Sequence, residues 1–224
     1  MGILRGPFFL IMAALTTIEL DTELSAVNQI LGSIGQAPVN NIGDLDDPNS
    51  VYKQSPEIDF IYNLLTSSNI EVQSEGWSFN REEHYTFTPD TSKHITIPKN
   101  VLQLDVCEEE VYRTTDVVQR DGKLYNKVKH SFEFDNPLDM NVVWLFPFED
   151  IPQPYRRLIT IKASVRAATQ LVSNPTLVQL LQQQEAYARA ICVEYECNQG
   201  DHNFLGMGQE QGYRSYEPFR GLRR

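Results

Sequence analysis

Four histidines are the first candidates for chemistry in this chain, and they are His84, His94, His130 and His202. Glu82 and Glu83 directly precede His84. Imidazole and carboxylate groups are common zinc ligands, so His84, His94 and Glu83 form a conceivable metal site. No HExxH or comparable spacing supports that site. We therefore predict no metal, no cofactor and no catalytic residue, and keep a metal-dependent hydrolase as an alternative.

The other familiar catalytic patterns are missing from the sequence. It contains no GxGxxG, GxxxxGK[ST] or GxSxG, so nothing indicates a phosphate-binding loop or a nucleophile elbow. The segment GSIG at residues 32–35 closes a predicted helix and does not open one. Asp116, Asp121 and Asp139 fit hairpin chemistry better than a pair of catalytic carboxylates. The sequence thus favours a protein that is not an enzyme.

Three cysteines, Cys107, Cys192 and Cys197, make an odd count that implies no closed disulfide framework. Cys192 and Cys197 lie five residues apart without a matching partner pair, which is not a zinc-binding spacing. We interpret all three as reduced and mostly buried thiols of a protein made in a reducing cytoplasm.

Composition and charge limit the possible functions. The chain has 224 residues, of which 41% are hydrophobic and 22% charged, so a globular protein of one large or two small domains is expected. The net charge of −11 argues against a grip on nucleic acid, which depends on Lys and Arg. An acidic surface would let DNA slide past. The alternative is a solvated surface that only keeps a monomer soluble.

The segment ELSAVNQILGSIGQAPV, residues 23–39, predicts a short amphipathic helix. Its apolar stripe consists of Leu20, Leu24, Val27, Leu31 and Ile34. Thr16 and Glu19 have the spacing of a capping box before it. Gly35 stands at the position of a left-handed C-terminal cap, and Pro38 prevents continuation.

Three further helices are predicted from the same periodicity. The second begins with Ser55 as N-cap and Pro56 in its first turn, buries Ile58, Ile61, Leu65 and Val72, and stops at Gly76. After Pro152 and Pro154, a third helix carries the stripe Leu158, Ile161, Val165 and Thr169. Asn174-Pro175 breaks it. The fourth helix then carries Leu177, Leu180, Leu181, Ala188, Ile191 and Tyr195.

Between Trp77 and Phe148 the period changes to two and the residues become aromatic and β-branched. Strands are predicted around residues 85–87, 95–97, 132–134 and 142–146. Asp121-Gly122 predicts a type I′ hairpin, because that turn needs positive φ at both positions. A two-residue loop there pairs Val118 with Tyr125 and Asp116 with Lys127 on one face.

These elements predict an α+β fold. A four-helix bundle would form from the N- and C-terminal helical pairs, with an inserted small antiparallel β domain and an extended C-terminal arm. The predicted segments are residues 1–15, an N-terminal extension; 16–76, a helical pair; 77–150, the β domain; 151–200, the second helical pair; and 201–224, the arm. Arg5 and the apolar run after it suggest a secretory signal, but no clean cleavage site follows. We favour an extension that packs on a neighbouring subunit.

The last segment, residues 201–224, differs from the rest in charge and composition. It carries a net charge of +1, whereas residues 1–200 carry −12. Aromatic residues and arginine are enriched at interface hot spots, so we interpret it as an arm that becomes ordered on a partner. A tail without a partner is the alternative. The residues predicted to bind are Tyr213, Arg214, Tyr216, Phe219, Arg220 and Arg223.

Several segments in a fixed order point to a family. After the first helix come EGWSFNREE (75–83), HITIPKNVLQLD (94–105), VVQRDGKLYN (117–126), FEDIPQPYRRLITIKAS (148–164) and CVEYECN (192–198). In this order and at these spacings the chain resembles the tail tubular protein A family, the head-to-tail adaptors of short-tailed, podovirus-type bacteriophages. The resemblance spans roughly residues 22–203.

The resemblance implies a structural virion protein of the phage tail. Copies would form a ring, a dodecamer by resemblance, between the portal protein and the nozzle protein (tail tubular protein B). The ring would extend the DNA channel, support tail fibre attachment and serve genome ejection, with passing DNA contacted without sequence specificity and no membrane involved. About twelve copies would carry a charge on the order of −130. A soluble β-sheet binding module with a concave pocket is the other alternative.

Overall fold

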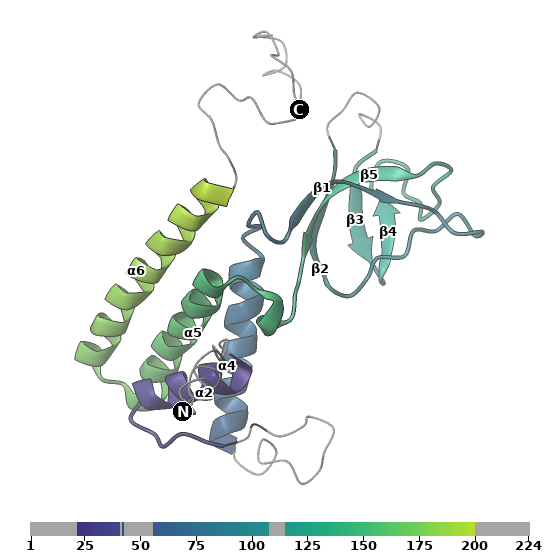
Figure 1. Ribbon diagram of the computed structural model, residues 1–224. Helices are drawn as coiled ribbons and strands as arrows, with labels where there is room; N and C mark the ends of the chain where they lie inside the picture. Colours follow the sequence, from purple (N-terminus) through teal and green to yellow (C-terminus); the bar gives the residue numbers. More distant parts are fainter. Residues whose placement is uncertain (1–21, 41, 43–55, 108–114, 200–224) are drawn as a thin grey trace, which may run out of the picture.

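The computed structural model describes residues 22–40, 42, 56–107 and 115–199. Helices gather on one side of the molecule and strands on the other (Figure 1). The chain passes from the helices to the strands after α4 (Pro56–Gln73) and returns before α5 (Gln153–Ala167). This mixture of helices with antiparallel strands confirms the predicted α+β class.

Helix α2 (Glu23–Ser33) begins later than the sequence suggested. Its N-cap is Thr22, which has an extended backbone (φ −93°, ψ 166°). The Thr22 side-chain oxygen accepts a hydrogen bond from the Ser25 amide at 3.3 Å. The capping box expected at Thr16 and Glu19 therefore does not start this helix; both residues, like Leu20, lie outside the described part of the chain.

The end of α2 agrees with the sequence prediction. Gly35 has φ +79°, and the Gln36 amide donates to the Leu31 carbonyl at 2.9 Å. This is the hydrogen bond of a left-handed C-terminal cap, for which glycine is the favoured residue. Helix α4 likewise buries its predicted stripe and is followed by Gly76 at φ +74°. Its expected N-cap, Ser55, is not among the described residues.

The predicted break between the last two helices is confirmed. Helix α5 continues as a short π-helical segment, η2 (Ala168–Val172), and Ser173 then adopts a left-handed backbone with φ 54°. Helix α6 (Pro175–Gln199) starts with Asn174 as its cap: the Asn174 side-chain oxygen accepts from the amides of Thr176 and Leu177.

The stripe predicted for α5 is only partly correct. Leu158 is buried, but Ile161 and Val165 are half-buried and Thr169 is exposed. The reason is that α5 contacts α2, α4 and α6, so burial covers a wide part of its surface and not one stripe. The apolar residues buried on α5 are Tyr155, Leu158, Ile159, Ala163 and Ala167.

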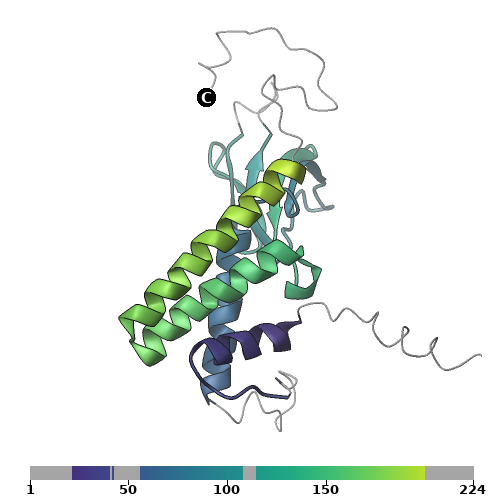
Figure 2. The same ribbon diagram turned by 60° about the vertical axis from the view of Figure 1, so that its left-hand side comes forward.

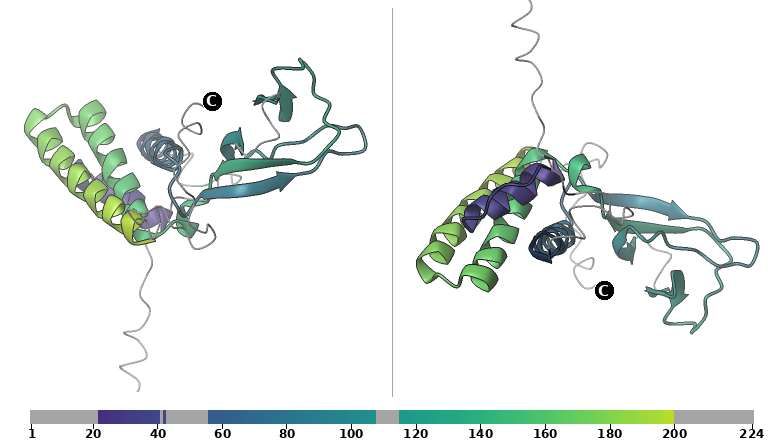
Figure 3. Two further views of the ribbon diagram at one scale, coloured as in Figure 1. Left: turned by 90° about the horizontal axis from the view of Figure 1, so that it is seen from above. Right: turned by 90° about the horizontal axis from the view of Figure 1, so that it is seen from below.

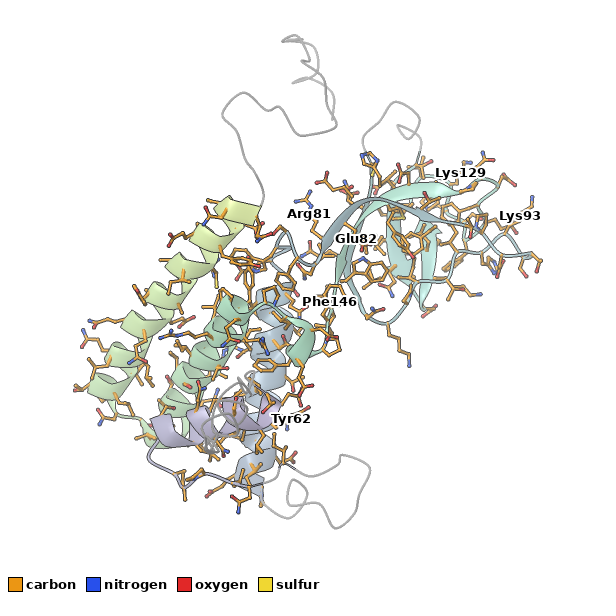
Figure 4. The ribbon with its side chains drawn as sticks, viewed as in Figure 1. Tyr62, Arg81, Glu82, Lys93, Lys129 and Phe146 are labelled. Atoms are coloured by element: carbon orange, nitrogen blue, oxygen red, sulfur yellow. The ribbon has the colours of Figure 1, made fainter. Side chains whose placement is uncertain are left out.

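Helix α5 is therefore the central helix of the helical unit. Helices α5 and α6 lie side by side, and α2 packs against α5 and α4 (Figures 2 and 3). Tyr62 on α4 donates a hydrogen bond to Glu23 on α2 at 3.1 Å, which adds a polar contact between the two N-terminal helices (Figure 4). One hydrophobic core runs through all four helices.

The larger sheet has three antiparallel strands in the order β1-β5-β2. Their bounds are β1 (Arg81–Phe87), β2 (Val101–Val106) and β5 (Leu138–Trp144). The middle strand, β5, buries Leu138, Met140 and Val142 against a second core. Strand β2 was not predicted as a strand from the alternation.

The predicted hairpin is confirmed in turn and register. Strands β3 (Val117–Arg120) and β4 (Lys123–Asn126) flank Asp121 and Gly122, whose φ angles are 51° and 70°. Val118 pairs with Tyr125. Beyond the strand ends, the Lys127 ammonium lies 2.6 Å from the Asp116 carboxylate.

Two other predicted strands are wrong. In residues 95–97 only Thr96 forms an isolated bridge, to Lys123, and residues 132–134 form no strand. Ile95 and Ile97 are nevertheless 1% and 3% exposed, because the loop lays alternate side chains into the β core. The alternation of apolar and polar residues correctly predicted which side chains are buried. It did not predict a strand, because an extended loop can bury alternate side chains without the hydrogen bonds of a β-ladder.

A buried polar network joins the two units where the chain crosses between them. The Gln73 amide nitrogen donates to the Phe146 carbonyl, and the Phe146 amide donates back to the Gln73 oxygen, both at 2.9 Å. The Asn80 amide donates to the carbonyls of Gln73 and Trp144, while its oxygen accepts from the Trp77 amide. Gln73 and Asn80 are 0% and 1% exposed. Figure 4 shows Phe146 at this crossing.

We expect Asn80→Ala to lower the free energy of unfolding by about 3 kcal/mol, since it removes three hydrogen bonds and leaves their backbone partners buried. Urea unfolding followed by circular dichroism measures the change. The exposed Asn136→Ala is the matched control. A loss no greater than that of the control would show that the network does not hold the junction.

Candidate assembly surface

The histidines singled out in the sequence do not form the metal site considered there. His84 on β1 lies with its Nδ1 2.8 Å from an Asp139 carboxylate oxygen on β5. The His94 ring instead lies 3.3 Å from the Lys123 ammonium. Among the described residues, His84 clusters with Cys107 and Asp139, not with His94 and Glu83. His130 is exposed elsewhere, and His202 lies outside the described residues.

The three aspartates also take separate places. Asp116 pairs with Lys127 and Asp121 occupies the hairpin turn, as the hairpin interpretation predicts. Asp139 does not belong to a hairpin turn, since it lies within β5 and faces His84. That interpretation was wrong for Asp139.

Exposed apolar side chains concentrate on η2 and α6. Of eight large hydrophobic residues exposed in the described part of the chain, five belong to these two elements: Leu171, Val172, Leu180, Tyr187 and Val193. Tyr187 is 66% exposed and Leu180 is 54% exposed. Leu180 was predicted from the helical stripe to be core, so its exposure corrects that prediction. With Tyr187, seven residues further on, it forms an apolar face that the described part of the chain does not cover.

This face borders a groove of about 330 Å³ between α5 and α6. Its lining residues are Arg157, Ile161, Leu180, Gln183, Gln184 and Tyr187. The α6 positions have the spacing of one helix face, whereas Leu181 and Ala188, one residue further on, point into the core. Helix α6 thus has an inner face for its own chain and an outer face that combines apolar and amide groups, a composition suited to a protein partner.

Ion pairs fix the helices that carry this face. Glu71 on α4 accepts hydrogen bonds from Lys162 and Arg166 on α5. The hydrogen bond from Lys162 holds the pKa of the Glu71 carboxyl below its usual value. Glu75 lies 2.6 Å from Arg189 on α6, and this hydrogen bond raises the pKa of the guanidinium. These pairs are partly exposed and therefore orient the helices more than they stabilise them.

A half-buried carboxylate, Glu196, holds the C-terminal half of α6. The Glu196 carboxylate accepts from the Ser78 amide, the Ser78 hydroxyl and the Tyr155 hydroxyl, each at 2.9 Å. Burial, together with this hydrogen bond, raises the pKa of Tyr155 above its usual range. Trp77 and Phe79 pack their rings within 5 Å of the Tyr155 ring. The end of α6 is therefore tied to the start of the β unit.

The same elements are matched by known proteins. A model of the family described as "Tail tubular protein" matches residues 24–202, from α2 to just beyond α6. The chain belongs to the tail tubular protein family. The family is a structural component of the phage virion tail. No helix within the described segments is long and apolar enough to cross a membrane.

One relative is the tail tubular protein A of Klebsiella phage KP34, which is 27% identical to this chain over 132 residues. The alignment covers 58% of this chain and 63% of that protein, so it spans less than two thirds of the relative's length. The family expected from the order of the sequence segments is thus confirmed.

The six arm residues predicted to bind a partner, from Tyr213 to Arg223, lie outside the described residues. Sequence reasoning missed the polar network, although Gln73 gave a signal: it stands beside Val72 at the end of an apolar stripe. It also missed Glu196, because nothing in the sequence distinguishes this residue from the many other glutamates and glutamines of α6. The outer face of α6 was hidden because exposed and core leucines look alike in one sequence.

Thiol labelling tests the placement of the cysteines. Cys107 and Cys192 are buried and Cys197 is exposed, so the prediction of mostly buried free thiols is confirmed. Burial raises the pKa of the Cys192 thiol to about 11, which leaves almost no thiolate at pH 8. We expect maleimide at pH 8 to modify Cys197 at once and Cys192 only after unfolding, as read by peptide mass. Cys197→Ser is the control, and rapid native modification of Cys192 would contradict the packing of α6.

Proposed function

We propose that this tail tubular protein is a ring-forming adaptor that joins the portal to the tail nozzle. The family match from α2 to α6 carries the proposal, because it includes both the helical unit and the β unit. The outer face of α6, with its exposed leucine and tyrosine, supports it as a surface for a neighbouring copy. The ring would hold about twelve copies with cyclic symmetry.

The predicted segments would divide the work within the ring. Helical segments 16–76 and 151–200 would form a bundle that packs on neighbouring copies, joined by the N-terminal extension, residues 1–15. The inserted β domain, residues 77–150, would form part of the distal surface that meets the nozzle and supports tail fibres. The arm, residues 201–224, would bind the portal and gain order there.

The acidic character of the chain suits a conduit for DNA. A net charge of −11 per copy repels phosphates, so DNA could pass during genome ejection without being held. Assembly order would follow from interfaces that are completed only after docking.

Self-association tests the outer face of α6. Leu180 and Val128 are each 54% exposed, but Val128 lies in the β unit. We expect Leu180→Lys to weaken ring formation at least tenfold, because a charge would be buried at the interface, and Val128→Lys to leave it unchanged. Light scattering or native mass measurement across a dilution series gives the result. Equal assembly by both variants would exclude α6 as the contact.

Binding to the cognate portal tests the adaptor role itself. We expect the full chain to join purified portal as a stoichiometric ring, and a chain ending at Gly200 to fail. Tyr216→Ala with Arg220→Ala should weaken binding in the same direction, since aromatic and arginine anchors supply most interface energy. The exposed Asn136→Ala is a control outside both the arm and the α6 face. A full chain that stays monomeric and indifferent to the portal would overturn the proposal.

A further inference from the structure

Three neighbouring strands of the larger sheet place groups that can bind a metal ion side by side, one from each strand or the residue that follows it. Asp139 lies on the middle strand, β5, and pairs with Thr86 on β1. On the other side, the residue after β2 is Cys107, whose amide donates to the Asp139 carbonyl at 3.1 Å. Strands β1 and β2 flank β5 (Figure 1). The carboxylate therefore has a neighbour on each side.

A bulge in β1 supplies the third donor. The register between β1 and β5 shifts between Glu82 and Tyr85, and His84 within the bulge has φ 60°. A left-handed backbone is uncommon for a residue with a β-carbon, and such strained positions cluster at functional sites. The consequence here is specific, because the bulge sets the His84 ring 2.8 Å from the Asp139 carboxylate.

The donor atoms lie close enough to share an ion. The His84 nitrogen, the Cys107 sulfur and an Asp139 oxygen all lie within 4.8 Å of one another. Ligand atoms around tetrahedral zinc are about 3.5 Å apart, so only a small shift of the side chains separates these atoms from that spacing. The second Asp139 oxygen, Oδ1, is buried and has no hydrogen-bond partner within the part of the chain that the structure describes. A cation would satisfy such an oxygen.

We propose that His84, Cys107 and Asp139 bind a divalent transition-metal ion of the zinc type. A thiolate, an imidazole and a carboxylate together favour zinc over magnesium or calcium, which prefer oxygen ligands. Binding releases the thiol proton, because the thiolate is the ligand. The His84 side chain is 53% exposed, so the ion is reachable and a water molecule can take the fourth position.

The ion would cross-link all three strands of the sheet at one end. Cys107 is 3% exposed and Asn141 accepts a hydrogen bond from its sulfur at 3.1 Å, so the thiol is already held in place. On metal binding the thiol proton is lost, so Asn141 would turn its amide NH2 toward the thiolate to orient it, as groups around metal ligands commonly do. The site belongs to the β unit alone and does not depend on ring formation or on the portal.

Cobalt binding to the full chain tests the proposal. The protein is treated with a chelator, returned to metal-free buffer under reducing conditions and titrated with Co²⁺, then with Zn²⁺ in competition. We expect one Co²⁺ per chain, with the intense visible bands of tetrahedral cobalt and a near-ultraviolet thiolate charge-transfer band. Zn²⁺ should remove both signals and raise the melting temperature.

Variants distinguish this site from adventitious binding. Cys107→Ser should abolish the charge-transfer band. Asp139→Asn, which keeps the shape of the side chain but removes a ligand charge, should weaken binding by at least about 100-fold, since losing an outer-shell partner alone costs about 10- to 100-fold. Cys197→Ser and His94→Ala should bind as the unchanged chain does. Circular dichroism confirms that each variant is folded. Loss of the thiolate band in Cys197→Ser, full binding by Asp139→Asn, or no cobalt signal at all would each overturn the proposal.

Discussion

The hydrogen bonds of Gln73 and Asn80 decide how the two halves of this molecule are oriented. The chain enters the β unit once and leaves it once. The side chains of Gln73 and Asn80 link the entering and leaving segments by hydrogen bonds to their backbone atoms. Apolar packing alone would tolerate many angles between a sheet and a helical unit, but a buried network in which each group needs its partner tolerates few. Specific orientation is what an assembly subunit requires, since errors in angle accumulate around a ring.

Stability and orientation come from different groups. The core around α5 buries aliphatic and aromatic side chains from all four helices, and burial of that kind supplies most of the folding free energy. The pairs of Glu71 and Glu75 lie at the rim, where solvent screens them. Glu196 is intermediate: it accepts from Tyr155, which is fully buried, and so ties α6 to the same junction.

The features predicted correctly from sequence are those governed by local chemistry. Asp121-Gly122, Gly35 and Asn174-Pro175 act within a few residues of themselves, and each forms the turn or cap expected of it. The wrong predictions depended on distant contacts. The exposure of Thr169 depends on which helices surround α5. Residues 95–97 form no strand because only Thr96 pairs with a neighbouring segment, through a single bridge to Lys123. The donor cluster of His84 needed the β1 bulge and the pairing of three strands, neither of which spacing reveals.

The two surfaces singled out here lie in different units, and this separation bears on assembly. The outer face of α6 belongs to the helical unit, whereas the donor cluster belongs to the sheet. Figure 3 shows the helices on one side of the molecule and the strands on the other, and the polar network lies where the chain crosses between them. In the proposed ring, a ligand that stiffens the sheet would therefore act on the helical unit through Gln73 and Asn80, with the contacts of Glu196 beside them. Because the network is buried and its polar groups are hydrogen-bonded, it resists bending between the two units. The orientation of the helical unit therefore sets the orientation of the β unit. Ring contacts through α6 would then position every β unit alike, which a common docking surface for the next tail protein requires.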